Sequence, residues 1–104
     1  WIGRPRLPRP GERIRSGYAV FTCVDQDAPS VFDDLLDATL DRAAARGLDY
    51  VLMGLDERDP LFRAAREHPH MPYHSRLFLA EWPDGGHLHA RLDHRPSYVE
   101  IATL

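Results

Sequence analysis

The stretch that decides the fold is VDQDAPSVFDDLLDATLDRAAARGLDYVLMGL, residues 24–55. Apolar side chains recur at helical spacing over residues 31–46, and aspartates occupy most of the opposite face. Gly47 follows the last turn of this pattern and is a typical helix stop. The run YVLMGL (50–55) then has the apolar character of a buried strand. The stretch therefore predicts a loop, an amphipathic helix and a strand in succession.

The ends of two helices have recognisable signals. Ser30 precedes the first apolar turn and is expected to cap the first helix. In DERDP, Asp59 is a candidate cap and Pro60 a candidate first residue of a second, short helix that runs to Glu67. The segment HPHMPYH that follows contains two prolines, which favour a loop.

Further apolar runs predict the remaining strands, which are GYAVFTCV (17–24), RLFLAEW (76–82), HLHARL (87–92) and YVEIATL (98–104). The first of them is apolar enough to be buried on both faces, and PDGG is expected to turn the second into the third. The order β-α-β-α-β-β-β predicts an α/β fold with a mixed sheet. A strand–helix–strand crossover makes the first two strands parallel, whereas the later hairpin is antiparallel.

Length and composition fit one domain that works in the cytoplasm. The chain has 104 residues and a net charge of −3, and no apolar run is long enough to cross a bilayer. A single cysteine, Cys23, forms no internal disulfide and is expected to pack in the core as a small apolar residue. We expect no contact with a membrane.

The first sixteen residues differ from the rest. Residues 1–16 are rich in proline and arginine, which is typical either of a solvated linker or of a basic arm for nucleic acid. The prolines and the lack of interleaved aromatic residues favour the linker, so nucleic-acid binding is unlikely. The folded part is then expected over residues 17–104, and the initial tryptophan suggests that the chain is a fragment.

Several segments together resemble a known family. LLDATLDRAAARGLDYVLMGL, GLDERDPL, MPYHSRLFLAEW and RPSYVEIATL look like the C-terminal half of bacterial proteins of the GNAT N-acetyltransferase superfamily. The resemblance covers roughly residues 17–104 by pattern. It implies an acyl-CoA N-acyltransferase-like half domain whose N-terminal half is missing. It also implies acetyl-CoA as the cofactor and an unidentified amine or other small molecule as the substrate.

The resemblance implies that four residues around the first helix bind the cofactor: Val24, Gln26, Ser30 and Val31. In the family, a loop with two glycines presents backbone N–H groups to the pyrophosphate. Here Ser30 and Phe32 occupy the glycine positions, and Asp33 and Asp34 add negative charge to the first turn. These carboxylates compete with phosphate for the same N–H groups, so the loop is degenerate.

Acyl transfer also needs groups that move protons. Phe62 stands where the family carries a tyrosine, and Tyr73, about ten residues later, is the candidate acid. Glu81 is the candidate base, and Glu100 is an alternative to it. Tyr73 could instead anchor its loop against the sheet, and Glu81 could be an ordinary solvent-facing strand residue.

Two further hypotheses belong to other classes. One is a non-catalytic GNAT-like module that serves assembly or ligand binding. It would self-associate as a homodimer or larger homo-oligomer through its sheet, and YVEIATL (98–104) is the strand expected to mediate this contact. The other is a metal binder that uses the H-x-H pairs of His68 with His70 and of His87 with His89. No carboxylate or cysteine has diagnostic spacing to either pair, so we expect no metal.

Overall fold

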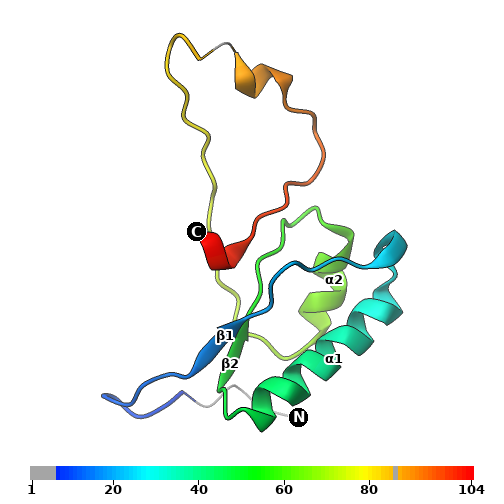
Figure 1. The fold of residues 1–104 in the computed structure, drawn as a ribbon, viewed down its shortest axis with the longest axis vertical. Helices are drawn as coiled ribbons and strands as arrows, with labels where there is room; N and C mark the ends of the chain where they lie inside the picture. Colours follow the sequence, from blue (N-terminus) through cyan, green and yellow to red (C-terminus); the bar gives the residue numbers. More distant parts are fainter. Residues whose placement is uncertain (1–6, 86) are drawn as a thin grey trace.

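The computed structural model describes residues 7–85 and 87–104, and it shows a small mixed α/β protein with two helices and a two-stranded parallel sheet. Along the chain the elements are β1 (Ser16–Tyr18), α1 (Pro29–Ala45), β2 (Tyr50–Leu52) and α2 (Pro60–Glu67), with short 3-10 helices at Asp25–Asp27, Leu88–Arg91 and Ile101–Thr103 (Figure 1). Part of the predicted linker, residues 1–6, lies outside the described residues.

The predicted parallel strand pair is confirmed, but both strands are short. Ser16 of β1 lies opposite Tyr50 of β2, and the register continues to Tyr18 opposite Leu52. One more hydrogen bond follows, in which Ala19 N donates to the carbonyl of Leu52 at 2.8 Å. Phe21 has a φ of 54°, which a strand does not accommodate. The prediction of a strand through residue 24 that is buried on both faces is therefore wrong.

Helix α1 begins two residues earlier than the apolar pattern predicted. Pro29 occupies its first turn, where a missing N–H costs no hydrogen bond. Ala28 is the residue before the helix, and no side chain caps it, so the prediction that Ser30 is the cap is wrong. The predicted stop is confirmed, because Gly47 adopts a φ of 72° and its N–H donates to the carbonyl of Ala44 at 2.9 Å.

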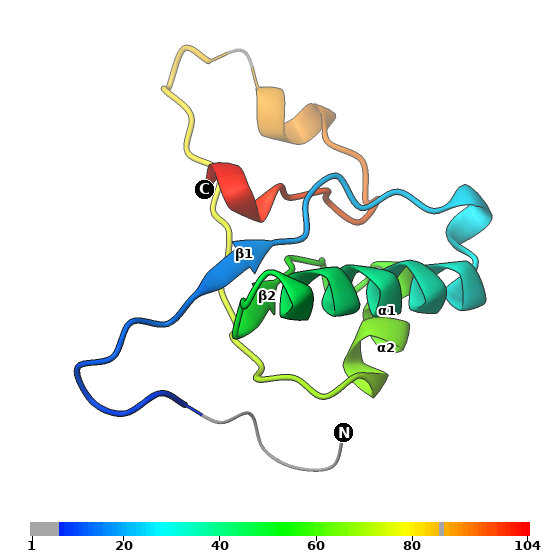
Figure 2. The same cartoon turned by 60° about the horizontal axis from the view of Figure 1, so that its bottom comes forward.

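Helix α2 follows its predicted signals closely. Asp59 precedes it, and its carboxylate accepts the N–H of Leu61 at 2.8 Å. Pro60 is the first helical residue. α1 contacts both β2 and α2, so the three elements form one packed unit (Figure 2).

The core of this unit is small and centres on Phe32, which is only 2% exposed. Around it lie Val24, Leu61 and Ala64, with partly buried Leu36 and other apolar residues at the margin. Cys23 is exposed, and the prediction that it packs in the core is wrong. Its neighbour Val24 is buried in the core instead.

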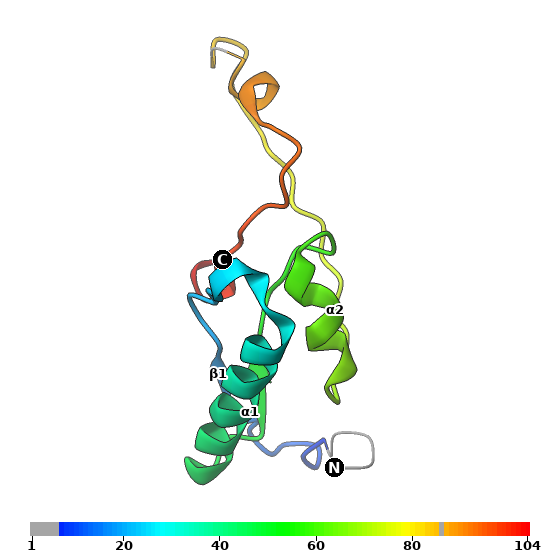
Figure 3. The same cartoon turned by 90° about the vertical axis from the view of Figure 1, so that its right-hand side faces the viewer.

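The three late strands that the sequence predicted are absent from the described residues. Residues 69–85 form no helix or strand, HLHARL contains a 3-10 helix at Leu88–Arg91, and YVEIATL contains another at Ile101–Thr103. Figures 1 and 3 show this part as a long loop that extends away from the two helices and returns to β1. A strand needs a neighbour for its N–H and C=O groups, and these segments have none there.

Candidate functional site

The predicted cofactor loop has a defined but glycine-free conformation. Gln26 lies in the 3-10 helix Asp25–Asp27 with φ 52° and ψ 26°, so a side chain occupies the left-handed region that glycine would favour. Val24 is buried in the core. Ser30 and Val31 lie exposed in the first turn of α1, and within the described residues their N–H groups meet no acceptor.

The chemistry around this helix end is acidic. Asp25 and Asp27 precede the helix, and Asp33 and Asp34 follow in its first two turns. Of these, Asp33 accepts a hydrogen bond from His68 Nε2 at 3.0 Å. Phe32, at one of the family's two glycine positions, is the most buried residue of the core, so this position faces the protein interior and not a ligand.

The two candidate catalytic residues have different surroundings. Tyr73 is 91% exposed in the loop after α2, which gives no support to the alternative that it anchors the loop. Glu81 lies farther along the loop, and its Oε1 contacts His89 Nδ1 at 2.7 Å. Residue 81 lies in no strand, so the alternative that Glu81 is an ordinary solvent-facing strand residue is wrong. A carboxylate and an imidazole in contact can exchange a proton, but neither Glu81 nor His89 lines the depression beside α2.

The two histidine pairs lie in different surroundings. His87 and His89 lie at the start of a 3-10 helix and not on a strand, so the geometric basis of that hypothesis is wrong. His68 contacts Asp33 and, at 3.7 Å, Asp37, whereas His70 Nδ1 contacts the carbonyl of His68. Within residues 7–85 and 87–104, no three His, Cys, Asp or Glu side chains are grouped to hold a metal ion.

A depression lies beside α2. It is open to solvent and is lined by Glu57, Phe62, Arg63, Arg66 and Glu67. The guanidinium carbon of Arg66 lies 5.6 Å from the centre of the Phe62 ring, which is a cation–π contact. None of the residues predicted to bind a cofactor or to catalyse a reaction lines it. The i, i+3 and i, i+4 spacing of the four lining residues on the predicted second helix was the sequence signal that they share one face.

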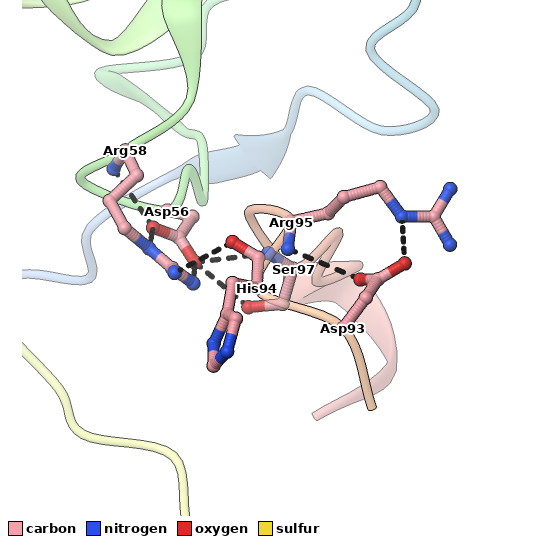
Figure 4. A network of polar contacts seen from close by, with 6 residues as sticks. All are labelled: Asp56, Arg58, Asp93, His94, Arg95 and Ser97. Atoms are coloured by element: carbon pink, nitrogen blue, oxygen red, sulfur yellow. Dashed lines mark hydrogen bonds and ion pairs between the residues drawn. The ribbon is translucent and has the colours of Figure 1, made fainter. Parts of the chain in front are cut away.

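Asp56, in the loop after β2, accepts several hydrogen bonds from other described residues. Its carboxylate accepts three hydrogen bonds from Arg58, from the backbone N–H, Nε and Nη2, at 2.8–3.2 Å. It also accepts the N–H and the hydroxyl of Ser97, at 3.1 and 2.9 Å (Figure 4). Arg58 Nη1 donates in addition to the carbonyl of His94 at 3.3 Å. The hydrogen bonds from Arg58, followed by those from Ser97, hold the pKa of the Asp56 carboxyl well below its usual value.

Glu100 forms a second, similar junction. It accepts the N–H of Phe21 and the hydroxyl of Tyr98, both at 2.9 Å, and the N–H of Ala102 at 3.4 Å. The bond from the Phe21 N–H lowers the pKa of Glu100, and the same carboxylate raises the pKa of Tyr98 because it accepts the phenolic proton. Asp56 and Glu100 thus fasten the C-terminal loop to the βαβα unit at two points. Neither junction has a signal in the local sequence, because Ser97 and Phe21, the partners that span each junction, are distant along the chain.

Comparisons with protein-family models, with curated proteins and with solved structures found no significant match. In the part of the chain that the structure describes, no helix has the length and apolar character needed to cross a membrane.

Proposed function

We propose that this chain is a non-catalytic module that self-assembles, and that the β-α-β-α unit of a GNAT-like half domain serves it as a scaffold. One observation carries the proposal: the loop fastened by Asp56 and Glu100 exposes large apolar side chains. Phe78 is 80% exposed and Trp82 is 81% exposed, and Leu77 and Leu79, on either side of Phe78, are also exposed. Exposed single apolar residues are ordinary, but a run of them on one fastened segment is typical of an interaction surface.

The test is sedimentation velocity of the chain over a hundredfold range of concentration. A self-assembling module gives a sedimentation coefficient that rises with concentration and approaches that of a dimer or larger oligomer. A coefficient that stays at the monomer value across the whole range contradicts the proposal. Circular dichroism of the same samples checks that the helices α1 and α2 are folded throughout.

A second candidate function is acyl transfer from acetyl-CoA to an amine, and it is favoured by the N-terminus of α1. The N–H groups of Ser30 and Val31 have no side-chain cap and point out of a helix end, where an anion is stabilised. Val24 and Gln26 would then border the bound pyrophosphate, with Tyr73 as acid and Glu81 as base. The aspartates at this helix end oppose it, which is why we place this function second.

Calorimetric titration of CoA into the chain tests this second candidate. Binding that disappears in the Ser30→Pro, Val31→Pro double variant would support a phosphate site at these N–H groups. A matched control is Asp41→Ala, an exposed change later on the same helix. No heat from wild-type chain at millimolar CoA would contradict cofactor binding and leave the assembly proposal untouched.

A further inference from the structure

Most backbone N–H and C=O groups between Arg76 and Asp84 form no hydrogen bond within the described residues. Within the described residues, no backbone N–H or C=O of residues 76–80 forms a hydrogen bond. In Figure 1 this yellow stretch of ribbon runs without a coil away from the helices. A solvated apolar run with free N–H and C=O groups is a template for strand pairing. We call residues 76–84, RLFLAEWPD, the pairing segment.

One face of the pairing segment is complementary to itself about the middle residue, Ala80. Its alternate residues read Arg76, Phe78, Ala80, Trp82 and Asp84, that is, a cation, an aromatic, a small residue, an aromatic and an anion. In a strand, alternate residues share one face. An identical strand laid antiparallel with Ala80 opposite Ala80 therefore places each cation near an anion and each Phe beside a Trp.

We propose that the pairing segment binds the same segment of a second copy of this chain, as an antiparallel strand pair about a two-fold axis at Ala80. This inference rests on the proposed assembly function and names its partner. A two-fold axis through an antiparallel pair must have one residue opposite itself, because the paired side chains have to share a face. With Phe78 or Leu79 at the axis, Arg76 would lie opposite Ala80 or Trp82. With Ala80 at the axis, Arg76 lies opposite the acidic residue Asp84.

The backbone hydrogen bonds are consistent with this register. The carbonyl of Trp82 already accepts the N–H of Gly85 at 2.8 Å, and Pro83 has no N–H to donate. If Leu79 and Glu81 form the hydrogen-bonded pairs, then Trp82 falls at a non-hydrogen-bonded position and its carbonyl stays with Gly85. Side chains come closest at such positions, which suits the pairing of Phe78 with Trp82. The next hydrogen-bonded pair is Leu77 with Pro83, in which only the Leu77 N–H can donate, so the ladder ends there.

The charges at the two ends are free to take part. Arg76 and Asp84 make no ion pair within the part of the chain described, whereas Glu81, on the other face of the strand, contacts His89. Two Arg76–Asp84 contacts, one at each end of the pair, then fix the register. Asp84 lies in the turn that begins at Trp82, just beyond the ladder. Its contact with Arg76 therefore requires the long arginine side chain to extend past the last ladder pair.

Charge substitution tests the register directly. Arg76→Asp places aspartates together at both ends of the pair, and Asp84→Arg places arginines together. Each single variant should dimerise more weakly by about tenfold or more. An equimolar mixture of the two variants should form a heterodimer with wild-type affinity, because its ends are again Asp with Arg. Arg91→Asp is the matched control, since it changes the same charge elsewhere in the loop.

Sedimentation velocity of the variants and of their mixture separates the outcomes. Restored dimerisation only in the mixture supports the proposal. A wild-type chain that dimerises with no response to either substitution overturns the pairing segment but keeps the assembly function, and a wild-type chain that is monomeric at every concentration overturns both. Leu79→Pro removes a ladder N–H without changing charge and should also weaken the dimer.

Discussion

The hydroxyl and the backbone N–H of Ser97 both donate to one carboxylate oxygen of Asp56, 41 residues earlier in the chain, at 2.9 and 3.1 Å. This single oxygen joins the loop after β2 to the returning end of the C-terminal loop. The Asp56 side chain is only 14% exposed, so solvent screens the contact less than it would at an open surface. The junction fixes where the loop that carries the pairing segment returns to the βαβα unit.

Asp56→Asn should loosen this junction. The amide keeps one acceptor oxygen but loses the charge that attracts Arg58 and Ser97. We expect the Ser97 amide to exchange with deuterium about tenfold faster, as for the loss of one hydrogen bond. Asp93→Asn is the control, because among the described residues Asp93 pairs only with the nearby Arg95. Equal exchange in wild type and Asp56→Asn would mean that the bonds to Asp56 do not hold the loop.

Glu100→Gln should lower the pKa of Tyr98 towards its usual value. In the wild type the phenol donates to the Glu100 carboxylate, and the negative charge disfavours the tyrosinate, so the pKa of Tyr98 is raised. A neutral amide removes that charge. The measurement is an NMR titration of the Tyr98 ring, with Glu12→Gln as a control that lies far away in the sequence. An unchanged Tyr98 titration in Glu100→Gln would contradict the contact.

The sequence predicts the helices much better than it predicts the late strands. Each helix carries its own signals, such as Pro60 after Asp59, and these act within a few residues. The parallel pair of β1 and β2 follows from the helix between them. The run 76–82 has every local property of a strand, but a strand also requires a partner edge, which local sequence does not contain. If the pairing segment binds a second copy, the prediction of a strand there is correct for the assembly.

The candidate site was harder to predict for a related reason. The positions matched to a phosphate loop include Phe32, and only its burial shows that this position belongs to the core. The contacts of Asp56 with Ser97 and of Glu100 with Phe21 join residues 41 and 79 apart in the chain. No local spacing pattern in the sequence predicts contacts between residues so far apart. The sequence therefore identifies the scaffold, and the structure is needed for the junctions that position its loop.

Acid should release the C-terminal loop before it unfolds the helices. The pKa values of Asp56 and Glu100 are lower in the folded chain than in the unfolded chain. Both groups therefore contribute stability that is fully present above pH about 4 to 5, near their ordinary pKa values, and that is lost as pH falls through the folded values. We expect amide protection at Ser97 and Phe21 to be constant from pH 7 to 5 and to fall below pH about 4.

The double variant Asp56→Asn, Glu100→Gln is the control for this acid response. It has no charge to lose at these two positions, so its loop protection should be low already at neutral pH and should show no step on acidification. Circular dichroism at 222 nm follows α1 and α2 over the same range. A wild-type loop whose protection is unchanged down to pH 2, with the helices still folded, would contradict the role of the two carboxylates.

Phe32→Ala should unfold the chain or nearly so. Phe32 is 2% exposed and lies among Val24, Leu61 and Ala64, which together form most of the buried core. Truncation of a buried Phe to Ala typically costs about 3–5 kcal/mol of unfolding free energy, and small domains have only about 5–15 kcal/mol in total. The adjacent Val31→Ala is the matched control, because Val31 is 46% exposed and should cost well under half as much. Urea unfolding followed at 222 nm measures both, and similar midpoints for the two variants would mean that Phe32 is not the centre of the core.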